Sequence, residues 1–107
     1  MNLLFVCSRN QWRSPTAEAI YKNHPELIAR SAGTEPSARI KLSAKMIHWA
    51  DIIFVMEKKH KERLLNKFPI DSQQKQIIIL DIPDEYKFMD TELIEEIQTI
   101  VKPYIEE

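Results

Sequence analysis

Apolar residues gather in four short runs along the chain, at residues 3–6, 27–32, 51–56 and 76–80. The first, third and fourth runs (LLFV, DIIFVM and QIIIL) lack the alternation of polar and apolar positions found in a strand with one wet face. Such continuous runs are typical of strands buried on both faces of a parallel sheet. The second run is weaker and leads into Gly33.

Segments with helical periodicity separate these four runs. Ser14 and Pro15 predict the start of a helix, with the serine as N-cap and the proline in the first helical position, and Pro25 is expected to end it. Short helices are expected over residues 43–49 and 57–67, the second with five basic residues on a solvated face. A last helix is expected where apolar residues repeat at helical spacing: Leu93, Ile97, Ile100, Val101 and Tyr104.

The resulting order β-α-β-α-β-α-β-α predicts an α/β fold, a doubly wound four-stranded parallel sheet with helices on both faces. With 107 residues and no repeat or linker, the chain is expected to form a single domain over residues 1–107. Ligands of such sheets bind outside the carboxyl ends of the strands. Cys7 follows the first strand and residues 81–84 follow the last.

Composition narrows the class of protein. Fifteen Lys and Arg residues stand against 16 Asp and Glu residues, without the basic excess of a nucleic-acid or membrane-surface binder. No signal-peptide pattern or membrane-length apolar run is present. Cys7 is the only cysteine, so no internal disulfide can form and a reducing, cytoplasmic location is expected.

No metal or other cofactor is expected. The three histidines, His24, His48 and His60, have no ligand spacing, and a second cysteine is lacking. They are expected to lie at the surface or half-buried. The oligomeric state is left open by the sequence.

The most informative segment is VCSRNQWRSP, residues 6–15, which runs from a strand end to a helix start. A loop in that place can point several backbone N–H groups at one spot, and the helix dipole adds positive potential, so an anion site is expected. The same field stabilises a thiolate at Cys7. Arg13 can contact phosphate oxygens with two N–H groups, and Ser14 can hydrogen-bond the thiolate. These parts predict attack of the Cys7 thiolate on phosphorus.

The spacing of Cys7, five residues, Arg13 and Ser14 resembles the phosphate-binding loop of the low-molecular-weight protein tyrosine phosphatases. Further matches extend the resemblance over nearly the whole chain: Asn10, Pro15, Ala17, Glu18 and the Ser31-Ala32-Gly33-Thr34 segment. The resemblance implies a cysteine-dependent phosphomonoesterase, a protein tyrosine phosphatase with a cysteinyl-phosphate intermediate and no cofactor. Its partner would be a phosphorylated protein or a small aryl phosphate.

The resemblance also implies roles for the other loop residues. Asn10, Ser14 and Ser31 would support the shape of the loop by hydrogen bonds. The substrate-binding residues would be Ser8, Arg9, Asn10, Gln11, Trp12, Ser14 and Tyr86. Arg9 stands where many members of the family have Gly, and would either add positive potential or simply lie on the surface. Trp12 replaces a second cysteine, so Cys7 has no partner for a protective disulfide.

The general acid is expected in the loop Asp81-Ile82-Pro83-Asp84-Glu85-Tyr86, because a leaving oxygen needs a proton donor at the opposite rim of the pocket. The family's acid loop resembles Asp-Pro-Tyr. That pattern places the acid at Asp84 and an aromatic wall at Tyr86, shared with Trp12, with Glu85 in place of proline. Asp81, at the strand end, is the alternative acid.

Other readings stay open. The loop also resembles that of a eukaryotic phosphatase acting on phosphoserine in the RNA polymerase II tail, so tyrosine preference is not fixed. A module that binds phosphate or phosphopeptides with little turnover is a further alternative, since Glu85 stands in the acid loop where the family has proline and residues 34–51 are shorter than is usual in the family. An autonomous arsenate reductase would need further cysteines, and a dinucleotide site would need glycine after the first strand.

Overall fold

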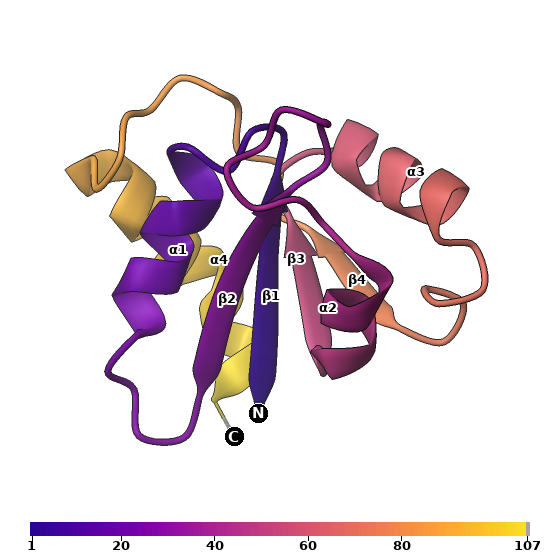
Figure 1. Ribbon diagram of the computed structural model, residues 1–107. Coiled ribbons are helices and arrows are strands. Elements are labelled where there is room, and N and C mark those ends of the chain that lie inside the picture. The colour runs from indigo at the N-terminus through magenta and orange to yellow at the C-terminus, as the bar shows by residue number, and fades with distance from the viewer. Residues whose placement is uncertain (107) are drawn as a thin grey trace.

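The computed structural model describes residues 1–106, in which four strands alternate with four helices (Figure 1). The elements are β1 (Asn2–Cys7), α1 (Arg13–Tyr21), β2 (Ile28–Gly33), α2 (Ala44–Trp49), β3 (Ile52–Val55), α3 (Lys58–Lys67), β4 (Gln76–Ile79) and α4 (Thr91–Ile105). The predicted order of elements is confirmed.

The strands form one parallel sheet in the order β2-β1-β3-β4. Phe5 in the central strand β1 pairs with Ser31 of β2 on one side and with Phe54 of β3 on the other. The chain adds β2 on one side of β1 and then β3 on the other side. The carboxyl ends of β1 and β3 are therefore adjacent at the topological switch point, where such folds bind ligands. Cys7 is the last residue of β1, at that edge.

Helices cover both faces of the sheet, as predicted, and each face has its own core. Leu3, Phe5 and Cys7 pack on the face covered by α1 and α4, where the rings of Phe5 and Tyr21 stack with centroids 5.8 Å apart. Leu4 and Val6 point to the opposite core with residues of α2 and α3. The side chains of β1 alternate between two cores, which explains why residues 3–7 are all apolar.

The start of α1 differs from the prediction. The helix begins at Arg13, and its N-cap is Trp12, which makes no side-chain capping bond. Ser14 is therefore not the cap, because its hydroxyl is turned toward Cys7 instead. The helix also ends at Tyr21, four residues before Pro25.

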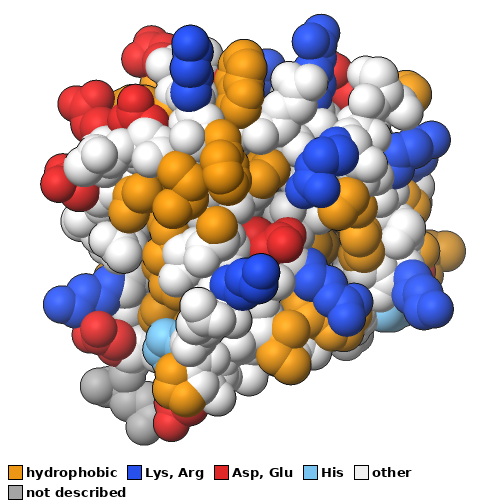
Figure 2. Space-filling view, turned by 60° about the vertical axis from the view of Figure 1, so that its left-hand side comes forward, with side chains coloured by type: hydrophobic (Ala, Val, Ile, Leu, Met, Phe, Trp, Pro, Cys, Tyr) orange, Lys and Arg blue, Asp and Glu red, His pale blue; other side chains and the backbone are white. Residues whose placement is uncertain are grey.

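The distribution of charged side chains on the surface is consistent with the near-equal numbers of acidic and basic residues. Figure 2 shows the face over α1 and α4, where acidic and basic side chains are interspersed among apolar ones. Among residues 1–106, no helix is both long and apolar enough to cross a membrane.

Candidate active site

The loop between β1 and α1 turns its backbone carbonyls outward, onto the segment that follows β2. Four consecutive carbonyls accept hydrogen bonds of 3.0–3.2 Å from that segment. The pairs are Cys7 O with Thr34 N, Ser8 O with Glu35 N, Arg9 O with Arg39 N, and Asn10 O with Arg39 Nε. With the carbonyls held outside, the N–H groups of the loop are free to face the opposite direction.

Within the described residues, the backbone amides of residues 8–14 donate to no other backbone or side-chain acceptor. Residues 13 and 14 open α1, so the partial positive charge of the helix N-terminus adds to that of the loop amides. A run of unpaired N–H groups closing on one point is an anion-binding nest.

Gly33 allows this loop to lie against the segment after β2. A Cβ atom at Gly33 would lie 2.6 Å from the carbonyl oxygen of Ser8 and 2.6 Å from Cβ of Ala38. Neither contact is sterically possible, so only glycine permits the close approach of the two backbones. The one glycine of the chain is therefore placed where the phosphate loop meets its support.

Cys7, Ser14 and Asn10 form a buried chain of polar contacts beneath the loop. The Sγ of Cys7 lies 2.9 Å from Oγ of Ser14, which accepts a hydrogen bond of 2.9 Å from Nδ2 of Asn10. Ser14 has one proton to give, and the sulfur is closer than the carbonyl of Ala32 at 3.4 Å. Donation to sulfur would stabilise a thiolate. Asn10 adopts a left-handed backbone (φ 57°), a region that asparagine tolerates better than most residues.

Arg13 is almost fully buried and is held from two directions. Its Nη1 donates to Oε1 of Glu57 at 2.6 Å and to the carbonyl of Ile82 at 2.8 Å. Burial alone would raise the pKa of Glu57, but the hydrogen bond and the charge of Arg13 outweigh it and hold that pKa below its ordinary value. Glu57 thus stays ionised and fixes the guanidinium at the floor of the site.

His60 joins the same network from the first turn of α3. Its Nδ1 accepts from the backbone N–H of Glu57 at 3.0 Å, and its Nε2 lies 2.8 Å from Oγ of Ser8. Burial, reinforced by the charge of Arg13, lowers the pKa of His60 to about 4. The neutral ring accepts at Nδ1, so its proton lies on Nε2 and is donated to Ser8. His60 is fully buried, so the prediction of a surface or half-buried histidine is wrong here.

A pocket of about 290 Å³ opens above Cys7. Its lining comes from the loop and from three further elements: Cys7, Ser8, Arg9, Gln11, Trp12, Arg13, Glu35, Lys59 and Asp84. The exposed Arg9 is paired with Glu35 at 3.1 Å. Trp12 is 43% exposed at the rim, which leaves its ring available to a ligand. Asn10 and Ser14 are buried beneath the loop and do not line the pocket.

The two candidate acids lie in different places. Asp84 lines the pocket, with Oδ1 3.7 Å from Nε of Arg13, whereas Asp81 borders a separate depression with Glu57 and Pro83. The loop that carries Asp84 is fastened near both ends. The N–H of Ile82 donates to Met56 O at 2.8 Å, and the N–H of Met89 donates to Oγ1 of Thr16 at 2.9 Å.

Two residues implied by the family resemblance lie elsewhere. Tyr86 is half-buried against the core between the sheet and α4, and it does not line the pocket above Cys7. Ser31 donates to Oε1 of Glu18 in α1 at 2.6 Å, so its implied bond to the phosphate loop is wrong. The contact of β2 with Ser14 comes from the main chain instead, through the carbonyl of Ala32 at 3.4 Å.

Glu57, His60 and Lys59 are site residues that the sequence reasoning missed. A signal was available, because Glu57 directly follows the apolar run at residues 51–56, whose carboxyl end lies beside that of β1. Residues 57–67 are rich in charged side chains, and such segments most often face solvent. That composition favours a solvated helix over a contribution to the site. In residues 1–106, no three His, Cys, Asp or Glu side chains come together as a metal site.

Comparison with known proteins agrees with this geometry. No protein-family model matches the chain. The low-molecular-weight protein-tyrosine-phosphatase Wzb of Escherichia coli K12 is 31% identical over 116 residues, spanning 80% of this chain and 78% of Wzb. The chain belongs to the low-molecular-weight protein tyrosine phosphatase family. It is accordingly a cysteine-dependent phosphatase.

Solved structures of several phosphatases share the fold. The Streptococcus pyogenes phosphatase SP-PTP has a TM-score of 0.77 at 17% identity, over 99% of this chain and 94% of that one. Wzb of E. coli K30 in complex with phosphate has a TM-score of 0.74 at 20% identity, over 96% and 94%. The YwlE arginine phosphatase of Geobacillus stearothermophilus has a TM-score of 0.73 at 20% identity, over 96% and 92%.

Proposed function

We propose that this phosphatase hydrolyses phosphomonoesters through a cysteinyl-phosphate on Cys7. The phosphoryl group sits in the nest of loop amides, with the guanidinium of Arg13 on its equatorial oxygens. The Cys7 thiolate attacks phosphorus, an S–P bond forms, and the bond from phosphorus to the leaving oxygen breaks. The amides and Arg13 stabilise the charge that builds on the equatorial oxygens. The observation that carries this proposal is the Cys7 thiol in a pocket lined by a loop whose backbone N–H groups have no acceptor among the described residues.

Asp84 acts as the general acid and then as the base. Its carboxylic acid gives a proton to the leaving oxygen as that bond breaks. Its carboxylate then takes a proton from water, whose oxygen attacks phosphorus. The S–P bond breaks, and inorganic phosphate and the Cys7 thiolate are released, with Ser14 stabilising the sulfur as leaving group.

The substrate class is a phosphorylated protein, with phosphotyrosine as the preferred residue. A phosphorylated aromatic ring would extend from the nest to the rim, where the exposed Trp12 can stack on it. Ser8, Arg9 and Gln11 complete the binding surface. A reducing compartment such as the cytoplasm suits a catalytic thiol that is the only cysteine of the chain.

Hydrolysis of an aryl phosphate and of peptides with phosphotyrosine, phosphoserine or phosphoarginine tests the proposal. We expect kcat/KM to be highest for phosphotyrosine, and Cys7→Ser to abolish turnover while phosphate binding persists. A matched control is Lys22→Gln, an exposed position at the end of α1. Phosphate binding without turnover in the parent protein would favour a binding module instead, and a preference for another phosphoresidue would overturn the tyrosine assignment.

A further inference from the structure

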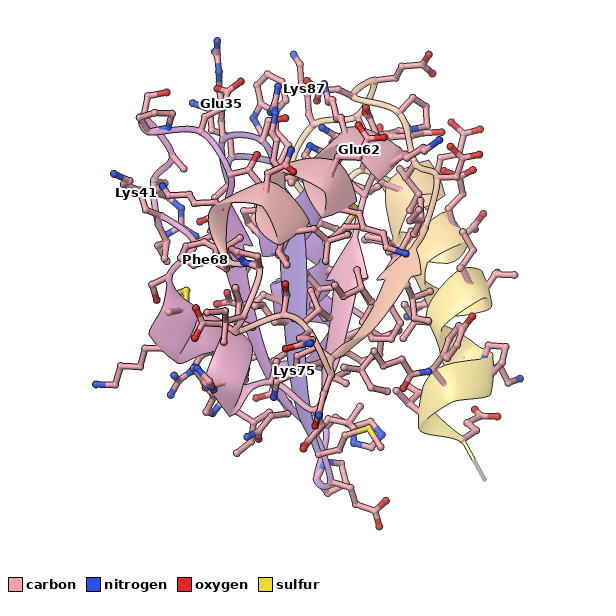
Figure 3. All side chains as sticks on the ribbon, turned by 90° about the vertical axis from the view of Figure 1, so that its right-hand side faces the viewer. Glu35, Lys41, Glu62, Phe68, Lys75 and Lys87 are labelled. Atoms are coloured by element: carbon pink, nitrogen blue, oxygen red, sulfur yellow. The ribbon has the colours of Figure 1, made fainter. Side chains whose placement is uncertain are left out.

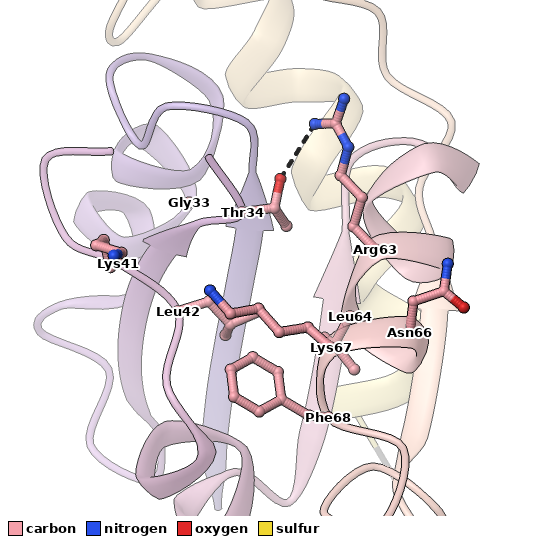
Figure 4. A pocket seen from close by; sticks show the side chains of 9 residues that line it. All are labelled: Gly33, Thr34, Lys41, Leu42, Arg63, Leu64, Asn66, Lys67 and Phe68. Carbon is pink, nitrogen blue, oxygen red and sulfur yellow. Dashed lines mark hydrogen bonds between the residues drawn. The ribbon is translucent and has the colours of Figure 1, made fainter. Parts of the chain in front are cut away.

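A second pocket lies between α3 and the segment that follows β2 (Figure 4). Its volume is about 340 Å³. Its floor is apolar, formed by the buried Leu42 and Leu64 with the half-buried ring of Phe68. A cavity of this size with an apolar base is large enough to take one or two side chains of a bound peptide.

The rim of this second pocket is basic. Lys41, Arg63 and Lys67 are exposed there, and no Asp or Glu is among the lining residues. None of the three makes an ion pair within residues 1–106. Among residues 1–106, the one hydrogen bond of the Arg63 guanidinium goes to Oγ1 of Thr34, at 3.3 Å (Figure 4). Three cations without carboxylate partners around an apolar floor are complementary to an acidic ligand with an apolar portion.

The second pocket and the catalytic pocket are lined by neighbouring residues of the same two segments. On α3, Lys59 lines the catalytic pocket and Arg63, one turn later, lines the second. On the facing segment, Glu35 lines the catalytic pocket and its neighbour Thr34 lines the second. Figure 3 shows the segment that carries Glu35 and Lys41 beside α3. The Glu35 carboxylate between the two pockets is paired with Arg9, so its negative charge is balanced there.

The spacing of the basic residues along α3 matches an extended peptide. Residues four apart on a helix are separated by about 6 Å along its axis. An extended chain advances about 3.3 Å per residue. Lys59 lines the catalytic pocket, so we count from a phosphorylated residue that lies beside it. A peptide laid along α3 from that point would reach Arg63 after about two residues and Lys67 after about four.

We propose that this second pocket binds acidic side chains of the phosphoprotein substrate, about two and four residues from the phosphorylated residue. The proposal rests on the proposed function and names a preference within its substrate class. Arg63 and Lys67 receive the carboxylates, and the apolar floor takes a neighbouring aliphatic side chain. The second pocket would thus distinguish one phosphoprotein from another. A small aryl phosphate is too short to reach it.

Two pairs of phosphotyrosine peptides test this proposal. In one pair, glutamate stands two and four residues after the phosphotyrosine, or glutamine replaces it. In the other pair the same residues precede the phosphotyrosine, since the groove does not fix the direction of the peptide. We expect the glutamate peptide of one pair to have a kcat/KM about fivefold higher than its glutamine partner, as two exposed charge pairs would give. This ratio should shrink at high salt.

The double variant Arg63→Gln, Lys67→Gln should bring the glutamate-to-glutamine ratio close to one. Lys22→Gln is the matched control, because it removes an exposed charge at the end of α1, outside both pockets, and should keep the parent ratio. A ratio of one in the parent for both pairs would overturn the proposal. So would a parent-like ratio in the double variant.

Failure of the proposed function is separable from failure of this inference. If the parent hydrolyses neither the peptides nor an aryl phosphate, the catalytic proposal fails. The same four peptides are then compared by their dissociation constants for Cys7→Ser, which needs no turnover. Tighter binding of a glutamate peptide, lost in the double variant, would still support the groove, and equal binding would refute it.

Discussion

The guanidinium of Arg13 and the carboxylate of Glu57 meet at 2.6 Å beneath the phosphate loop, although the two residues are 44 positions apart in the chain. Glu57 is also the N-cap of α3, where it forms a capping box with His60. One residue therefore both caps a helix and orients the phosphate-binding arginine. The loop after β1 and the first turn of α3 form a single unit.

Glu57→Gln is expected to lower kcat/KM for an aryl phosphate about tenfold, with a small effect on folding. Glutamine keeps a hydrogen-bond acceptor for Arg13 and for the helix N-terminus, but it loses the charge that fixes the guanidinium. The affinity for inorganic phosphate and steady-state kinetics measure the effect. Glu62→Gln, an exposed position on the same helix, is the control. Parent-like kinetics in Glu57→Gln would show that Arg13 needs no charged partner.

The buried His60 should make the protein less stable at acid pH. Its pKa is about 4 in the folded state and about 6.5 unfolded, so the unfolded chain binds the proton more readily. The free energy of unfolding should fall by about 3 kcal/mol as pH drops from 6.5 to 4, since each pKa unit is worth about 1.4 kcal/mol. The cationic neighbours Arg13, Lys59 and Arg63 oppose protonation, while Glu57 favours it.

Urea unfolding of the parent and of His60→Asn at neutral and acid pH measures this effect. The variant should be less stable at neutral pH but should lose less stability on acidification, because it has no group to protonate at that position. His24→Asn, at an exposed histidine, should follow the parent. Identical pH dependence in the parent and in His60→Asn would contradict the assignment of a neutral buried ring.

Much of the fold could be predicted because its signals are local in the sequence. Continuous apolar runs mark strands buried on both faces, and their alternation with helices leaves few arrangements. The spacing from Cys7 to Arg13 is also local, since one loop carries both. The start of α1 was misplaced because Ser14 suits two tasks, helix capping and contact with sulfur, and only the loop conformation decides between them.

The rest of the site depends on contacts between distant segments. Glu57 and His60 reach the phosphate loop only because β3 lies beside β1 in the sheet. The motif predicts a contact from Ser31 to the loop, but Ser31 donates to Glu18, which lies one turn after Ser14 on α1. Sequence spacing predicts which residues share a loop, whereas strand order determines which side chains from distant segments meet.

Asp84→Asn is expected to lower kcat for an aryl phosphate by about 10²-fold, the usual contribution of a general acid. Its carboxyl lines the pocket near Arg13, while Asp81 lies in a separate depression. If Asp84 supplies the proton, Asp81→Asn should change kcat by less than about threefold. A phosphate ester with a very acidic leaving group should reduce the defect of Asp84→Asn. A larger loss with Asp81→Asn would move the acid to the end of β4.

Gly33→Ala is expected to distort the phosphate loop and to weaken phosphate binding. The new Cβ would lie 2.6 Å from both Ser8 O and Ala38 Cβ, so the loop and its support must separate. Overpacking of this kind costs about 1–3 kcal/mol in the free energy of unfolding, and phosphate affinity should fall with it. The double variant Gly33→Ala, Ala38→Gly removes only the side-chain clash. Its activity should stay low, because the clash with the Ser8 carbonyl persists; full recovery would show that Ala38 alone sets the limit.

Trp12→Ala is expected to raise KM for an aryl phosphate about tenfold, as loss of one aromatic contact of about 1–1.5 kcal/mol would do. Trp12 lines the pocket at its rim, whereas Tyr86 packs on the core beside α4. Tyr86→Phe keeps that packing and should leave KM unchanged, which makes it the matched comparison. KM for an alkyl phosphate should respond little to either change, because no ring is available to stack. An unchanged KM for the aryl phosphate in Trp12→Ala would remove the aromatic wall from the binding site and, with it, the main structural reason for a tyrosine preference.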